Sequence, residues 1–255
     1  MTKRSLNILR VLLDLLKYSI SAYPALLLIN SPLAIFIFIG RLSFIFYVFF
    51  LFPYLQAVSI LYVHHYSNGD QWKLSDLFKF AFTRFPQLLI GHLLVIFSLS
   101  AVFIIFSLAS SLVAFILLVI MEILGSSIDP IARLLLLFVG VLAIGGIAGL
   151  FCYSKLLLVP HLIAIERYNA TDSFIETLRL TKDNRIRIFL ILLAFLLGGF
   201  LPVIYISLNP LLVGIFIFKQ QIYAAAGGFM LCQPLIFIYS FVVYKHLKGG
   251  AKAAD

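Results

Sequence analysis

The five histidines of this chain are its clearest candidates for chemistry, because imidazole ligates metals and haem and exchanges protons near neutral pH. Four of them fall where apolar segments end, on the side that the charge pattern assigns to the cytoplasm: His64, His65, His161 and His246. His92 instead lies about two turns into an apolar segment. A b-type haem needs two facing imidazoles, and His92 has no clear partner at its level. We therefore expect histidines that pack and form hydrogen bonds, and no cofactor.

Three ionisable residues, Glu122, Asp129 and Arg133, group at the junction of two apolar segments. Charge inside a membrane is the first place to look for a transport path. Here the charges flank the turn sequence GSSIDP, residues 125–130, so we interpret them as an outer loop in which Asp129 pairs with Arg133 at i, i+4. The mid-membrane acids that a proton relay needs are missing from the sequence.

Catalytic and metal-binding patterns are missing as well. The sequence shows no serine–histidine–acid constellation, phosphate loop or paired carboxylates. Cys152 and Cys232 lie in apolar runs without a CxxC motif or a Cys/His cluster, which indicates small buried side chains and no metal site. We therefore predict that the protein is not an enzyme. A structural or accessory membrane protein of the cell envelope is our first hypothesis. A carrier or lipid-handling protein is the alternative, and a membrane enzyme is the least favoured.

The composition shows which solvent these residues meet. Hydrophobic residues make up 63% of the 255 residues, charged residues only 11%, and the mean hydropathy is +1.13. Soluble domains carry about 25% charged residues, so the sequence predicts an all-α polytopic protein, a single integral membrane domain over residues 1–255. The net charge of +9 marks cytoplasmic loops, because no water-facing segment is large enough to bind nucleic acid.

Apolar runs predict about six transmembrane helices, near residues 6–29, 33–63, 86–108, 131–158, 186–208 and 222–245. Ser31-Pro32 suits a helix start, which places the first turn at Asn30-Ser31; a turn at Gly40-Arg41 stays open. Residues 111–124 are too short to span alone, so they extend the third helix or form a half-helix outside. The first helix carries a polar stripe that lies along the membrane interface or faces a cavity or partner: Lys3, Asn7, Arg10, Asp14, Lys17 and Ser21.

The distribution of positive charge sets the topology. Sixteen of the 19 Lys and Arg residues fall in the two terminal segments and in the loops after the second and fourth expected helices. The remaining three are Arg41, Arg133 and Lys219. Because cytoplasmic loops carry the excess of Lys and Arg, we predict that both termini are cytoplasmic.

Each of the two large cytoplasmic loops contains an amphipathic helix that we expect to lie flat in the headgroup plane, over residues 75–85 and 171–182. Ser173 and Glu176 fit a capping box at the start of the second helix. The expected apolar faces are Leu77, Phe78, Ala81 and Phe82 in the first helix, and Phe174, Ile175 and Leu178 in the second. The candidate lipid-headgroup contacts are Lys79, Arg84, Arg179, Lys182, Arg185 and Arg187.

Two weaker patterns concern internal symmetry and helix contacts. The similar tetrapeptides SDLF and TDSF, 96 residues apart, suggest a weak internal duplication around residues 64–108 and 160–208. Small residues allow membrane helices to approach closely, and the candidate helix-packing residues are Gly145, Gly149, Ala224 and Gly228. The expected partners are the phospholipid bilayer and either a membrane protein or a second copy of the chain.

The segment LVPHLIAIERYNATDSFIETLRLTKDNRIRIFLILL, residues 158–193, carries a resemblance to a known family. A membrane helix ending in Pro leads to an acidic residue, an amphipathic helix and a basic step into the next helix. The segment resembles the YciC-type proteins of the bacterial inner membrane, which are akin to the membrane domain of some glycerophosphodiester phosphodiesterases. The matching positions are Pro160, Glu166, Ser173, Leu180 and Asn184. The resemblance implies six helices in the bacterial cytoplasmic (inner) membrane, and implies no activity because the phosphodiesterase barrel is absent.

Overall fold

Helices account for all regular secondary structure in the described part of the chain. The computed structural model describes residues 6–31, 47–70, 72–123, 129–194 and 233–248. The elements are α1 (Ile8–Asn30), the π-helix η1 (Tyr47–Leu51), α4 (Phe52–Asn68), α5 (Leu74–Ile123), α6 (Pro130–Leu156), α7 (Val159–Ala164), α8 (Ala170–Thr181) and the 3-10 turn η2 (Lys182–Asn184). Residues 185–194 and 233–248 are helical as well. The predicted all-α fold is confirmed.

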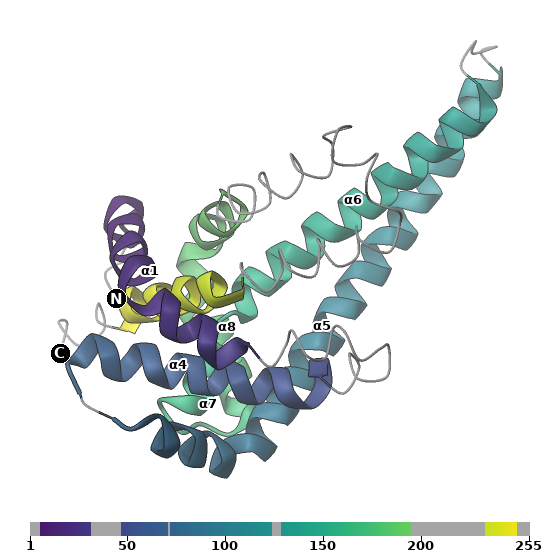
Figure 1. Ribbon diagram of the computed structural model, residues 1–255. Helices are drawn as coiled ribbons and strands as arrows, with labels where there is room; N and C mark the ends of the chain where they lie inside the picture. Colours follow the sequence, from purple (N-terminus) through teal and green to yellow (C-terminus); the bar gives the residue numbers. More distant parts are fainter. Residues whose placement is uncertain (1–5, 32–46, 71, 124–128, 195–232, 249–255) are drawn as a thin grey trace, which may run out of the picture.

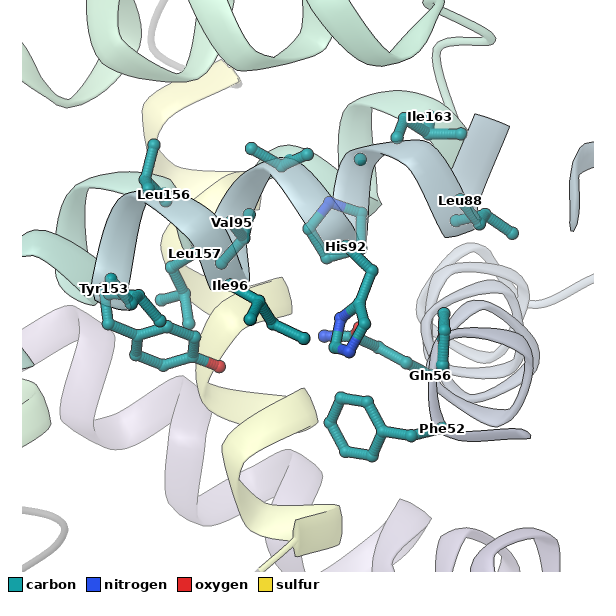
Figure 2. A pocket seen from close by; sticks show the side chains of 15 residues that line it. Phe52, Gln56, Leu88, His92, Val95, Ile96, Tyr153, Leu156, Leu157 and Ile163 are labelled. Atoms are coloured by element: carbon teal, nitrogen blue, oxygen red, sulfur yellow. The ribbon is translucent and has the colours of Figure 1, made fainter. Parts of the chain in front are cut away.

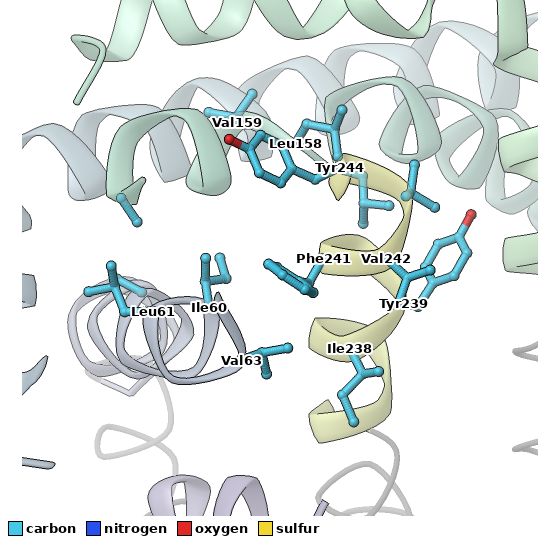
Figure 3. Packing of buried hydrophobic residues seen from close by; sticks show 14 of the residues in the cluster. Ile60, Leu61, Val63, Leu158, Val159, Ile238, Tyr239, Phe241, Val242 and Tyr244 are labelled. Carbon is cyan, nitrogen blue, oxygen red and sulfur yellow. The ribbon is translucent and has the colours of Figure 1, made fainter. Parts of the chain in front are cut away.

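The helices form a bundle from which one long hairpin projects. α1, α4, α7, α8 and residues 233–248 lie together, and the α5–α6 hairpin extends away from them (Figure 1). The core lies where α4, α7 and residues 233–248 meet, and Ile60, Leu158 and Phe241 are buried there (Figure 3). The far half of the hairpin instead exposes large apolar side chains on both helices: Leu112, Phe115, Ile116, Leu135, Phe138 and Val139. Surface of this kind is suited to lipid contact.

Among the described residues, three helices are long and apolar enough to cross a membrane: Ile8–Asn30, Leu74–Ile123 and Ile131–Ala164. The other expected helices, near residues 33–63, 186–208 and 222–245, lie partly outside the described residues. Six transmembrane helices therefore stay a prediction. The positions Arg41, Lys219, Ala224 and Gly228 also lie outside the described residues.

The first helix ends where the sequence indicated. α1 stops at Asn30, and the Ser31 hydroxyl donates a hydrogen bond to the Leu28 carbonyl at 2.8 Å. Asn30 itself is buried, and its side-chain amide bonds Ser59 of α4 at 3.2 Å and Gln233 at 3.3 Å. A satisfied amide in a low-dielectric core fixes which helices are neighbours. The alternative turn at Gly40-Arg41 lies outside the described residues.

α5 is a single helix of 50 residues, although the sequence suggested a break at Pro86. We predicted a separate helix over residues 75–85; this boundary is wrong because these residues are the first turns of α5, and their position in the headgroup plane stays a prediction. Proline removes one backbone hydrogen bond and bends a helix, but the residues before Pro86 (AFTRF) include no glycine or other turn former that would end it. Figure 1 shows α5 changing direction near its beginning. Residues 111–123 extend this same helix, which was one of the two alternatives.

The tip of the hairpin is organised by a different ion pair from the predicted one. The Asp129 carboxylate caps α6 by accepting hydrogen bonds from the backbone of Ile131 at 2.8 Å and of Ala132 at 3.1 Å. Arg133 instead donates to Glu122 of α5 at 3.1 Å. The predicted Asp129–Arg133 pair is therefore wrong, because the helix start occupies the carboxylate and the antiparallel helix brings Glu122 alongside.

Gly145 lies where α6 packs tightly against α5. A Cβ atom built there would overlap the Ser107 hydroxyl and lie 3.0 Å from the ring of Phe103. Gly149, one turn further along α6, has no atom within 4 Å of the corresponding position. Of the two described candidates for helix packing, only Gly145 therefore lies in a tight contact within the chain.

This contrast predicts opposite effects of the same substitution at the two glycines. Gly145→Ala should lower the free energy of unfolding in detergent by about 1–3 kcal/mol, because the packed ring of Phe103 must move. Gly149→Ala should be neutral or stabilising by up to about 1 kcal/mol, since alanine favours the helix. Thermal or denaturant unfolding of both variants measures the difference, and equal effects would contradict the packing described for Gly145.

Candidate functional site

α8 is an amphipathic helix that begins earlier than the sequence indicated. Its N-cap is Asn169, whose side-chain oxygen accepts a hydrogen bond from the backbone of Asp172 at 2.7 Å. The Asn169 amide in turn donates to the Asp172 carboxylate at 2.6 Å. The predicted capping box at Ser173 is therefore wrong. Asn169 has the extended backbone of an N-cap residue, whereas Ser173 lies inside the helix and donates to the Ala170 carbonyl at 2.8 Å.

The side of α8 that packs on the bundle is small and hydroxyl-bearing. Ala170, Ser173, Thr177 and Thr181 are its buried residues. The Thr181 hydroxyl lies 2.9 Å from the Thr177 carbonyl and 3.3 Å from the Lys155 carbonyl at the end of α6. Small side chains let helices approach closely, and a hydroxyl bonded to a carbonyl can be buried at little cost. The helix is thus held on the bundle by its less hydrophobic side.

The apolar flank of α8 points away from the bundle. Ile175 is 61% exposed and Leu178 is 40% exposed, while Phe174 is half-buried. Beyond η2, Ile186 and Leu190 are exposed as well, at 66% and 50%. We call Ile175, Leu178, Ile186 and Leu190 the apolar strip. The equivalent face at the start of α5 differs, because Leu77 and Ala81 are buried and Phe82 is 69% exposed.

The six basic candidates have different surroundings. Lys79, Lys182 and Arg185 are exposed, and Arg84 is half-buried. Arg179 pairs with Glu176 at 2.8 Å on the exposed surface. Arg187 donates to the backbone carbonyl of Leu6 at 3.2 Å and so helps to hold the N-terminal segment. Lys182 and Arg185 therefore lie near the apolar strip in sequence, are exposed, and belong to no ion pair among the described residues.

Polar side chains from distant parts of the chain meet at the end of the bundle that contains the predicted cytoplasmic segments. The imidazole of His161 is fully buried, lies 3.3 Å from the Ser240 hydroxyl and stacks on Tyr244. Tyr244 donates a hydrogen bond to Glu166, which Lys248 approaches to 3.6 Å. We call His161, Glu166, Ser240, Tyr244 and Lys248 the inner cluster. Sequence reasoning placed His161 at a helix end but gave no sign of its partners, because they lie about 80 residues away.

Two further contacts join this end of the bundle to α1. His246 Nε2 lies 2.9 Å from the Asp14 carboxylate, and the Lys245 ammonium lies 2.8 Å from the Tyr18 hydroxyl. Asp14 belongs to the predicted polar stripe of the first helix. Through Asp14 this part of the stripe contacts residues 233–248 of the chain itself, and a cavity or a separate partner facing the stripe stays a prediction. The other described members of the stripe are exposed: Asn7, Arg10, Lys17 and Ser21.

His92 lines a small cavity between α4, α5, α6 and α7 (Figure 2). The cavity holds about 120 Å³, and its polar lining residues are Gln56, His92 and Tyr153. Ligand pockets usually measure roughly 300–1,000 Å³, so this space suits a few waters. The His92 ring packs 5.4 Å from the ring of Phe52. Among the described residues, no group of three His, Cys, Asp or Glu side chains is arranged to hold a metal ion.

His64, next to the inner cluster, gives the folded state a pH dependence. Burial lowers the pKa of His64, and His65 lowers it further, while Asp70 and Glu166 oppose the shift and Lys245 adds to it. The folded protein therefore binds this proton less readily than the unfolded chain. The stability that neutral His64 contributes is complete above the unfolded pKa of about 6.5 and is lost as the pH falls below it.

We accordingly expect the unfolding midpoint in detergent to fall between pH 7 and pH 5, and expect His64→Gln to reduce this fall. One proton contributes at most about 1.4 kcal/mol per pH unit. Tyr66→Phe, at the same helix end, is the matched control because it removes no group that titrates in this range. An unchanged pH profile for His64→Gln would contradict the prediction.

Comparison with known proteins gives one family and no precedent for an activity. The chain matches, over residues 12–247, the family described as a domain of unknown function (DUF7847). No curated protein and no solved structure matches it. The YciC-type resemblance therefore stays a prediction. The match includes α4, α5, α6, α7 and α8, together with the helical residues 233–246 that contact α1. Because it covers nearly the whole chain, the protein belongs to the DUF7847 family.

Proposed function

We propose that this protein is a multi-pass protein of the bacterial cytoplasmic membrane with a structural or accessory role, held against the inner leaflet by α8. The observation that carries the proposal is the orientation of α8, which packs its hydroxyl side on the bundle and turns Ile175 and Leu178 outward. An interfacial helix buries its apolar side at the boundary of headgroups and acyl chains. Anionic headgroups are the partners that the neighbouring basic residues suit.

Simple energetics favour lipid over water on the apolar strip. Full burial of one Leu or Ile side chain contributes about 1.5–3 kcal/mol. The four residues of the strip are each at least 40% exposed, so covering them with acyl chains would contribute several kcal/mol in total. Lys182 and Arg185 would add about 1 kcal/mol each near an anionic surface. In water the same strip would be an exposed apolar patch beside positive charge, which soluble monomers rarely carry.

The hairpin supports residence in the membrane. A helix of 50 residues is about 75 Å long, whereas the hydrocarbon core is about 30 Å thick. The exposed apolar residues of α5 extend from Ile90 to Ile123, and α6 carries similar residues from Ile131 to Ile147. The α5 stretch rises about 50 Å and the candidate span Ile131–Ala164 has 34 residues, so both helices are long enough to cross the core even when tilted. The YciC-type resemblance agrees with this proposal and adds six helices, and the distribution of Lys and Arg adds that both termini are inside.

The proposed topology predicts the sidedness of two reporter fusions. A reporter after residue 255 should be active in the cytoplasm, and one inserted within residues 125–130 should be active on the opposite side, because positive charge retains the inner loops. Alkaline phosphatase and fluorescent-protein fusions at both sites measure this. Reporter activities that place both sites on the same side of the membrane would contradict the predicted topology.

A second prediction concerns the depth of α8. In a chain whose two native cysteines are replaced by serine, a fluorophore at Leu178 should be quenched by lipids that carry quenchers near the headgroups. A fluorophore at Asp172, on the polar flank of the same helix, should be quenched mainly by aqueous iodide. The physical reason is that the apolar flank enters the interface and the polar flank stays in water.

The result at Leu178 also discriminates between lipid and a protein partner. Protection of Leu178 from both lipid-borne and aqueous quenchers would indicate a membrane-protein partner or a second copy of the chain. The lipid-surface proposal would then have to be abandoned. Equal aqueous quenching at Leu178 and Asp172 would place α8 away from any membrane.

A further inference from the structure

An apolar groove runs along one face of α6, between α5 and the helical residues 185–194. Its volume is about 520 Å³. Val102 and Phe106 of α5 form one wall, and Phe189 belongs to the other. The α6 lining residues recur at intervals of three and four, as on a single helix face: Ile144, Ile147, Ala148, Phe151, Cys152 and Lys155. The groove is thus a continuous apolar channel that ends at one basic side chain.

Lys155 has no carboxylate partner among the described residues. Its ammonium lies 4.4 Å from the centroid of the Phe151 ring. The carbonyl of Lys155 accepts the Thr181 hydroxyl at 3.3 Å, which places this end of the groove beside the end of α8. A charge at the end of an apolar membrane surface needs an anionic partner or water.

The length of the groove matches one leaflet. From Ile144 to Lys155 the helix rises about 16 Å, and one leaflet contributes about 15 Å to the hydrocarbon core. The predicted topology puts the Lys155 end at the cytoplasmic face, where anionic lipids are enriched. An acyl chain would therefore lie against Phe106, Ile147 and Phe151 while its phosphate reaches the Lys155 ammonium. Length, polarity and charge all agree with this one occupant.

We propose that this groove is a binding site for one anionic phospholipid, with its acyl chain along α6 and its phosphate on Lys155. The inference rests on the proposed membrane residence but not on the position of α8. It assigns Lys155 a specific ligand, in contrast to the surface attraction proposed for Lys182 and Arg185. In the sequence, Lys155 is one of the basic residues expected on the cytoplasmic side. Val102 and Phe189 are distant from it in the sequence, so no sequence pattern indicates the groove.

Native mass spectrometry of the full chain in detergent tests the site with two defined lipids, phosphatidylglycerol and phosphatidylcholine of identical acyl chains. We expect the protein to retain one phosphatidylglycerol more tightly than phosphatidylcholine. Lys155→Gln should weaken phosphatidylglycerol roughly fivefold, which corresponds to about 1 kcal/mol per basic residue, and should weaken phosphatidylcholine less, because the choline cation already offsets the charge of its phosphate. Lys155→Arg should preserve the preference. Lys73→Gln, about 40 Å along α5 from the groove, is the matched charge control and should have no effect.

A second variant tests the groove without changing its charge. Ala148→Phe fills the groove and should reduce retention of both lipids, while unfolding midpoints of all variants verify that they are folded.

Two outcomes for lipid selectivity would overturn the proposal: an unchanged preference for phosphatidylglycerol in Lys155→Gln, or equal affinity for the two lipids in the unmodified chain. Dimers that disappear in Ala148→Phe would overturn it too, because a second copy would then occupy the groove. The two proposals can fail separately. If lipid-borne quenchers did not quench a fluorophore at Leu178, while the preference for phosphatidylglycerol still depended on Lys155, the surface role of α8 would be wrong and the lipid site at Lys155 would be supported.

Discussion

The scarcity of polar side chains along most of this chain is the constraint on which the rest of the structure depends. In hydrocarbon every backbone N–H and C=O group needs a partner in its own segment, so the apolar sequence forms long helices. Several serine side chains within these helices are satisfied in the same way, by their own helix. The hydroxyls of Ser98 and Ser111 bond the carbonyls four residues earlier, at 2.8 Å and 2.7 Å. The α5–α6 hairpin can therefore carry serine and still present an apolar surface on both helices.

Side chains that cannot satisfy themselves are gathered at the ends of the bundle, and there they connect segments that are far apart in sequence. Asn184 accepts a hydrogen bond from the backbone of Leu6 at 2.9 Å, and Arg187 returns one to the Leu6 carbonyl. The contacts of Lys245 with Tyr18 and of His246 with Asp14 add residues 233–248 to the same end. Apolar packing alone is non-directional, so these polar contacts specify which helices are neighbours.

The sequence was informative about local structure and poor at predicting these connections. Hydrophobic runs located α1, the two hairpin helices and α8, because each run is long or strongly periodic. The break at Pro86 was wrong because no turn former precedes the proline. The Ser173 capping box and the Asp129–Arg133 pair were wrong because Asn169 caps α8 and Glu122 pairs with Arg133 instead. The groove at Lys155 depends on three segments that only the fold brings together. No local pattern in one segment encodes such a site.

α8 shows why hydrophobicity is a poor guide to orientation in a membrane protein. In a soluble protein the apolar side of an amphipathic helix faces the core. At a bilayer surface acyl chains solvate isoleucine as well as the core does, so apolar contact with the bundle offers no advantage. Size and hydrogen bonding then decide: Ser173 and Thr181, whose hydroxyls bond backbone carbonyls, pack inward while Ile175 remains outside. Lys155 obeys the same logic at the end of its groove: the lipid that can cover the apolar face is also the molecule that can bring the missing negative charge.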